Sequence, residues 1–286
     1  GSGAFPAGFL WGLKAPPLRF LLEGGCAREH LELLRLLPPG GIHGVTLDWP
    51  LIEPEDGRFD GEVLADLRGF LESVVEQGHV PLLSLSAGAL PGWAQESGGW
   101  AHPRTLDRFD VYAGRMADAF RGLPRFWCTL DDPASIALGG RSRAPQIQGL
   151  GTAWRSLANL MAAHGRSYRV LKREAPEVPA GLCHALDSIV PLRPGWGPDR
   201  WTANILDGFV NKAVLLALAT GNLRGGFPRV AVPEAKGTLD FLGLSYRGRT
   251  RWFFDWTKPD TGFLCRWNGE AVIRSEDGPE ADPRGL

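Results

Sequence analysis

Short apolar segments alternate with amphipathic segments along most of the chain, and this alternation constrains the fold more than any other feature. Residues 62–77 carry apolar side chains at helical spacing, which form a single buried stripe. The next segment, residues 79–85, is a short apolar run typical of a buried strand. Strands that alternate with helices in this way predict a parallel sheet with helices packed outside it.

The same pattern recurs up to Tyr246 and predicts an α/β fold with about six strand-helix units. Helices are expected at about 28–37, 62–77, 105–121, 152–174 and 202–220, and strands at 9–13, 44–48, 79–85, 126–130, 181–185 and 239–246. An open doubly wound sheet would give the same alternation, but no GxGxxG or GxxxxGK[ST] motif follows the first strand. We therefore expect a reduced or incomplete (β/α)8 architecture like that of a TIM barrel, in a single domain spanning residues 1–286.

After Tyr246 the alternation stops. Residues 251–256, 262–267 and 271–274 are predicted to form short strands of a meander, and residues 275–286 a flexible polar tail. At the other end, residues 1–3 are interpreted as a cloning remnant and not as part of a signal peptide.

The composition argues against several classes of partner. The formal net charge is −1, which favours neither nucleic acid nor an anionic membrane, and no apolar run approaches the roughly 20 residues of a membrane span. The four cysteines form no CxxC unit, so we expect no metal site, no other cofactor and a cytoplasmic location.

Six collinear motifs resemble glycoside hydrolase family 1, the β-glucosidase family, and the resemblance covers nearly the whole chain. They are FPAGFLWG at 5–12, DWPLIEP at 48–54, LSL with LPGW and GGW within 83–100, WCTLDDP at 127–133, AH at 163–164 and LDFLGLSY at 239–246. Each is weak alone, but together they stand in the family's order on the expected elements. The resemblance implies a TIM barrel, a β-linked sugar as ligand and a role in carbohydrate metabolism.

The resemblance also implies where the catalytic residues should lie. The family's acid/base glutamate, in W-x-T-x-N-E-P, falls on Asp132, and the preceding asparagine falls on Asp131. An aspartate is one methylene shorter, which sets its carboxyl group back by about 1.5 Å. A retaining glycosidase needs a second carboxylate roughly 5–5.5 Å away, and the family's nucleophile motif, T-E-N-G, does not occur in this sequence.

Other sugar-binding positions of the family also differ here. Its glutamine falls in the apolar stretch 20–22, its pocket histidine on Ala87, its second-strand arginine on Leu51 and its sixth-strand asparagine on Ser245. These replacements predict a more apolar pocket, suited to a less polar small molecule than a free sugar.

Several further residues are candidates for ligand binding beside Asp131, namely Trp93, Trp100, Trp127 and Tyr246. Aromatic rings can form the floor of a sugar site, but they can equally pack loops and core, and for Trp127 packing is favoured. The Asp-Asp-Pro turn can likewise act as a loop cap without any catalytic role. His164 and His184 are interpreted as core histidines.

Three hypotheses follow from these observations. The first is a pseudo-glycosidase (a pseudoenzyme) with a remodelled pocket at the C-terminal ends of the strands. The second is an active β-glycosidase in which Asp132 is the acid/base and a missing segment or partner chain supplies the nucleophile. The third is a structural or interaction module that pairs, as a homo-oligomer or with a complementary chain, through open sheet edges.

Overall fold

The computed structural model describes residues 11–23, 26–37, 39–139 and 149–267. Its strands are β1 (Gly12–Lys14), β2 (Ile42–Thr46), β3 (Val80–Ser84), β4 (Phe126–Asp131), β5 (Ala180–Pro191), β6 (Asn222–Leu223), β7 (Val230–Ala231), β8 (Phe241–Phe254) and β9 (Leu264–Arg266). The motif at 5–12 lies mostly outside these residues, as do the third meander strand and the predicted tail.

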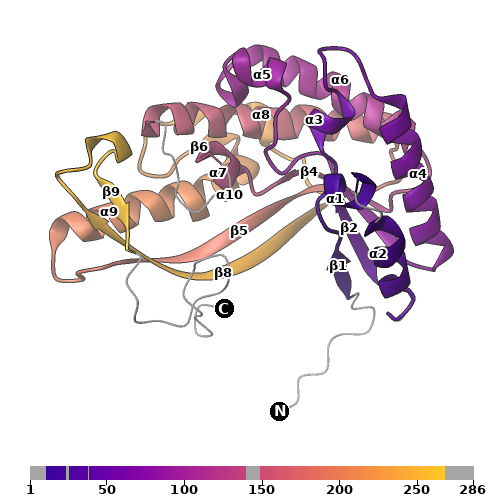
Figure 1. Cartoon of the computed structure of the whole chain (residues 1–286). Coiled ribbons are helices and arrows are strands. Elements are labelled where there is room, and N and C mark those ends of the chain that lie inside the picture. The colour runs from indigo at the N-terminus through magenta and orange to yellow at the C-terminus, as the bar shows by residue number, and fades with distance from the viewer. Residues whose placement is uncertain (1–10, 24–25, 38, 140–148, 268–286) are drawn as a thin grey trace.

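The main sheet has seven strands in the order β1-β2-β3-β4-β5-β8-β9. All neighbours pair in parallel except β9, which is antiparallel to the far end of β8. The sheet curls and carries its helices on the convex side, as part of a barrel would (Figure 1). The α/β, barrel-like fold with six parallel strands is therefore confirmed, and within the described residues β1 and β9 remain the two edges of an open sheet.

The helices follow the strands in sequence. They are α1 (Leu18–Glu23), α2 (Cys26–Leu34), α3 (Trp49–Ile52), α4 (Gly61–Glu76), α5 (Gly92–Glu96), α6 (Pro103–Ala119), α7 (Pro133–Ala137), α8 (Leu150–Glu174), α9 (Gly197–Asp207) and α10 (Ala213–Thr220). Short 3₁₀ turns form η1 (Gly99–Ala101), η3 (Pro233–Ala235) and η4 (Pro259–Thr261), and a π-helical turn, η2 (Gly208–Lys212), joins α9 to α10.

Local sequence signals account for the helix boundaries. The Asp60 carboxylate accepts from the backbone N–H groups of Glu62 and Val63 and so caps α4. The buried positions of α4, from Leu64 to Val74, are those of the predicted apolar stripe. In α6, Pro103 occupies the first turn, where a missing N–H has no energetic consequence.

The region after Tyr246 differs from the prediction. Residues 251–254 do not form a separate strand but continue β8, which pairs with β5 as far as Pro191 beyond a register shift at Leu186/Asp187. Pairing between β5 and β8, which are distant in sequence, lengthens both strands beyond the barrel-like part of the sheet. Local residue patterns do not encode such pairing. The second predicted meander strand corresponds to β9, which adds in antiparallel orientation to Trp252–Phe254 at the edge opposite β1.

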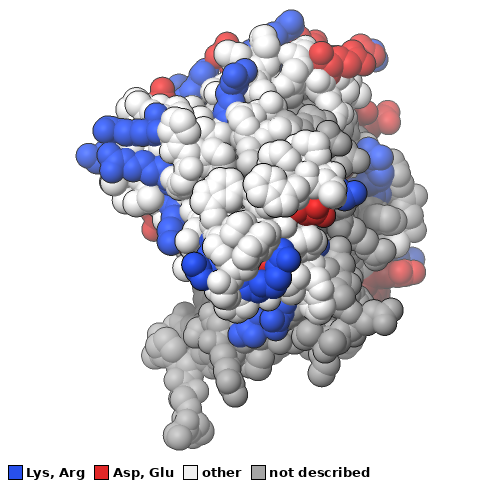
Figure 2. All heavy atoms as spheres, turned by 90° about the vertical axis from the view of Figure 1, so that its left-hand side faces the viewer, with Lys and Arg blue, Asp and Glu red and all other residues white. Residues whose placement is uncertain are grey.

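This extension ends in a group of aromatic rings. Phe254 contacts the rings of Trp196, Trp201, Trp256 and Phe263 at centroid distances of 4.5–6.5 Å. Trp201 and Trp256 are exposed, and several Lys and Arg side chains lie on the visible described surface at this end of the molecule (Figure 2).

The continuous helical stretch Gly197–Thr220, which is α9, η2 and α10, is long and apolar enough to cross a membrane. However, 56% of its apolar window is buried inside the molecule, as for the core helix of a soluble protein. Within it, α9 packs against β5 and β8, and α10 packs against α8, β6 and η3, where Ala213, Val214, Ala217 and Leu218 join the core.

Candidate functional site

Two adjacent carboxylates lie at the C-terminal end of β4, where barrels place their functional groups. Asp131 is the last residue of β4, and Asp132 caps the short helix α7. The register of β4 against β5 shifts between Cys128 and Asp131, so the two side chains have different surroundings.

The Asp131 side chain lies on the concave face of the sheet. It forms an ion pair with the ammonium group of Lys14 from β1, and the two side chains are 13% and 49% exposed. Both line a groove of about 380 Å³ together with small residues such as Ser84, Cys183 and Ser245. In a closed barrel this face would be interior.

Asp132, in contrast, is 1% exposed and has a left-handed backbone with φ of 65°. A non-glycine residue in this region carries strain of about 1–3 kcal/mol. The conformation is held by a hydrogen bond of 2.8 Å from the Asp132 N–H to the Cys183 carbonyl. The Oδ1 atom also accepts from the Ser135 N–H at 3.4 Å, at the start of α7.

Arg247, the residue after Tyr246 on β8, occupies the other side of the Asp132 carboxylate. Its Nη1 lies 3.3 Å from Asp132 Oδ2, at ion-pair distance but without the geometry of a hydrogen bond. The same guanidinium donates to Ser135 Oγ and Asp187 Oδ1, each at 3.0 Å. Arg247 therefore joins Asp132 and Asp187 in one partly buried network, which we call the Arg247 network.

Two further groups in this network have shifted pKa values. Burial raises the pKa of Asp187, and the adjacent Arg247 only partly opposes this shift. Burial lowers the pKa of His184, whose Nδ1 lies 3.9 Å from Asp132 Oδ1, and the Asp132 charge works in the opposite direction. The backbone of Asp187 is held by Asn211 in the π-helical turn η2, through its N–H at 3.0 Å and its carbonyl at 2.8 Å. Such turns often occur at functional sites.

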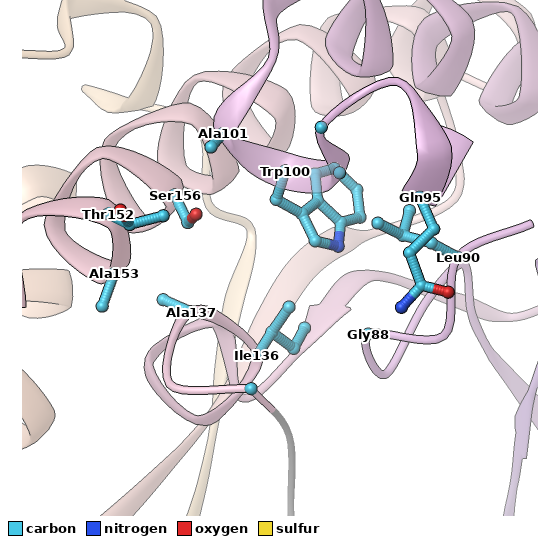
Figure 3. A pocket seen from close by; sticks show the side chains of 13 residues that line it. Gly88, Leu90, Gln95, Trp100, Ala101, Ile136, Ala137, Thr152, Ala153 and Ser156 are labelled. Carbon is cyan, nitrogen blue, oxygen red and sulfur yellow. The ribbon is translucent and has the colours of Figure 1, made fainter. Parts of the chain in front are cut away.

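The three predicted tryptophans lie in surroundings that differ from those of the two carboxylates. Trp127 is 1% exposed within the core. Trp93 donates its indole N–H to the Glu53 carbonyl and packs edge-on against Trp49. Trp100 lines a separate cavity (Figure 3), and Tyr246 is half-buried on β8.

A cavity lies beside Lys14 at the C-terminal ends of β1, β2 and β3, and we call it the mouth cavity. It measures about 390 Å³ and its wall includes Ala15, Pro16, Ala87 and Ala89. Lys14 and Asp48 are the only ionisable residues among its described lining residues. Such a cavity is large enough for a small ligand, and its hydrogen-bonding side chains are those of Lys14, Thr46 and Asp48.

The family model described as Glycosyl hydrolase family 1 matches residues 43–244, which is more than half of the chain. The chain belongs to glycosyl hydrolase family 1. Beta-glucosidase A from Thermotoga maritima is 28% identical over 280 residues, which cover 91% of this chain and 60% of that protein. Klotho from Rattus norvegicus is 30% identical over 222 residues, covering 70% of this chain and 22% of that protein.

Solved structures support the same fold. The family 1 β-glucosidase from Thermotoga maritima superposes with a TM-score of 0.81 at 22% identity, covering 98% of this chain and 73% of that one. The β-glycosidase from Pyrococcus horikoshii gives a TM-score of 0.78 at 20% identity. The chain thus spans about 60% of the length of the first curated relative that it matches.

Within the family framework, sequence reasoning located Asp131 and Asp132 but missed their partners. Lys14 and Arg247 lie on β1 and β8, far from β4 in sequence, and no local spacing links them to it. The one available signal was position, since Arg247 directly follows the sixth-strand motif at the end where barrel sites form.

Proposed function

We propose that this family 1 chain is a pseudo-glycosidase, which does not cleave β-glycosides through Asp132. The observation that carries this proposal is the state of the Asp132 carboxylate, which is 1% exposed and ion-paired with Arg247. A general acid must come within hydrogen-bond distance of the glycosidic oxygen. A carboxylate enclosed by α7, His184 and Arg247 has no path to such an atom without rearrangement.

The mouth cavity supports the second half of the proposal, a remodelled small-molecule site. Ala87 stands where the family resemblance placed a sugar-binding histidine, and it lines this cavity. The polar side chains that remain in its wall are those of Lys14, Thr46 and Asp48, and the replacement of the histidine by Ala87 favours a ligand less polar than a free sugar.

The direct test is turnover of an aryl β-glucoside and an aryl β-galactoside over pH 4–8, with Asp132→Ala as the matched variant. We expect no turnover by the native chain above that of the variant. Turnover that disappears in the variant would show that Asp132 works as an acid. The proposal would then fail, and a nucleophile from a further segment or a partner chain would be needed.

A second candidate is an interaction module that pairs through the open sheet. The outer edge of β1 has no strand neighbour among the described residues, and Trp11 and Leu13 beside it are 66% and 43% exposed. A complementary strand or a second copy could pair there. Light scattering tests this candidate, because a monomer at high concentration argues against self-pairing and a dimer supports it.

A further inference from the structure

A further cavity lies at the N-terminal ends of β1 and β2, at the opposite end of these strands from the mouth cavity. Its wall comes from the first residues of the two strands, the end of α2 and the segment that precedes β3. Its volume is about 480 Å³, within the range of small-molecule sites. We call it the base cavity.

The side chains that line the base cavity are almost all apolar. They include those of Trp11, Leu13, Leu34, Leu37, Pro39 and Ile42. Among the described lining residues, the one polar side chain is that of His79, whose Nε2 donates to the Leu34 carbonyl at 3.1 Å. No Asp, Glu, Lys or Arg is among them, whereas the mouth cavity contains Lys14 and Asp48. A charged ligand would therefore lose its hydration in the base cavity without gaining a counter-ion, and a neutral apolar one would not.

The base cavity opens beside apolar side chains that are exposed to water. Trp11, Leu13 and Leu37 of its wall are 66%, 43% and 43% exposed. Neighbouring large apolar side chains in this state are uncommon on soluble proteins and mark a binding surface. A ligand in the cavity would remove part of these three side chains from water, and burial of apolar surface drives association.

Hydrogen bonds join the parts of the wall to one another. The Ile42 N–H donates to the Trp11 carbonyl at 2.7 Å, and the Gly40 N–H donates at 2.8 Å to the carbonyl of the glycine before His79. The His79 ring in turn donates to the carbonyl of Leu34, the last residue of α2. The cavity is therefore formed before any ligand arrives, and this lowers the entropy lost on binding.

From these observations we propose that the base cavity binds a neutral, largely apolar small molecule, of the class of a medium-chain alcohol. The apolar body of the ligand lies against Trp11, Leu34 and Leu37. Barrels place their catalytic groups at the C-terminal ends of the strands, and this site is at the other end. It therefore does not depend on the mouth cavity or on whether Asp132 is catalytic.

The test is a fluorescence titration of the whole chain with N-phenyl-1-naphthylamine, a neutral aromatic probe whose emission rises in apolar surroundings. We expect saturable binding of the probe and its displacement by decanol. Decanoate has the same chain with a charged carboxylate, and the described wall offers it no cation. It should therefore displace the probe about tenfold less effectively than decanol, or worse.

Two adjacent leucines provide a variant and its matched control. Leu37→Gln places a polar amide in the wall of the base cavity, and it should weaken probe binding about tenfold. Leu36 is 81% exposed and is not among the described residues of the wall, so Leu36→Gln should bind the probe as the native chain does. Both positions follow α2 and are exposed, so both variants should keep the native circular dichroism spectrum.

A third variant locates the probe. Ala89→Leu narrows the mouth cavity and should leave probe binding unchanged. The proposal would be overturned by a lack of saturable binding, by equal binding in Leu37→Gln and Leu36→Gln, by equal displacement with decanol and decanoate, or by loss of binding in Ala89→Leu. Light scattering at the same protein concentrations completes the test, because a dimer that excludes the probe would show that a second copy covers the base cavity and would also overturn the proposal.

Discussion

Asp131 and Asp132 are neighbours in sequence, yet they lie in two different electrostatic environments. Asp131 faces the open concave groove and pairs with a half-exposed lysine. Asp132 lies under α7 and belongs to the Arg247 network, with a left-handed backbone. The same residue type therefore pairs with a half-exposed lysine in one position and lies fully buried beside an arginine in the next.

The largest expected loss of stability comes from breaking the buried ion pair between Asp132 and Arg247. Arg247→Met removes the cation and leaves the Asp132 carboxylate buried without its counter-ion. Loss of one partner of a buried pair costs about 3–5 kcal/mol, and we expect the lower end because the Arg247 side chain is 31% exposed. Urea unfolding followed by tryptophan fluorescence measures the change.

The double variant Asp132→Asn with Arg247→Met provides the control for this experiment. If Arg247→Met loses stability because the Asp132 carboxylate is left buried without a counter-ion, the double variant should be more stable than Arg247→Met alone. Equal stability of the two would show that Arg247 acts by packing or through Asp187, and the contrast between the two aspartates would lose its electrostatic basis.

Acidification should lower the free energy of unfolding, because two buried histidines on the helix-covered side of the sheet resist protonation. Burial lowers the pKa of His164 to about 4, against hydrogen bonding to Thr238, and burial with the neighbouring His30 and His79 lowers that of His43 to about 4. Below pH 6.5 the unfolded chain gains protons that the folded chain does not accept until about pH 4. The unfolding free energy should therefore fall by about 1.4 kcal/mol per pH unit for each histidine within this window.

A comparison of the native chain with His164→Gln isolates this effect from that of the carboxylates. The variant should be less dependent on pH between 6.5 and 4, as measured by the urea midpoint at each pH. Parallel curves for the two proteins would contradict the assignment of His164, which is 0% exposed between Thr129 and Thr238, as a neutral core residue.

The smallest expected loss of stability comes from breaking the ion pair between Lys14 and Asp131. Lys14→Ala should lower the free energy of unfolding by about 1 kcal/mol or less, because the lysine of this pair is half-exposed and an ion pair open to water gains little over solvation. That loss should shrink further in 0.5 M salt, whereas the loss in Arg247→Met should change little. A loss above about 2 kcal/mol for Lys14→Ala would mean that the concave groove is more enclosed than its 49% exposed lysine indicates.

Patterns within the chain were sufficient for the elements that follow local rules. The apolar stripes of α4, α6 and α8, and the buried runs of β3 and β4, were predicted within a few residues because one packed face imposes a regular spacing. The order of these elements, with the family motifs at the strand ends, was enough to predict a barrel-like sheet with Asp131 and Asp132 at the C-terminal end of its fourth strand.

Tertiary structure decided everything that depends on partners distant in sequence. Only the folded chain brings Lys14 to Asp131 and Arg247 to Asp132, and pairs β8 with β5 as far as Trp252. Sequence spacing determines which face of an element is apolar. The state of a carboxylate depends instead on burial and on charges within a few ångströms, which the packing of separate elements sets.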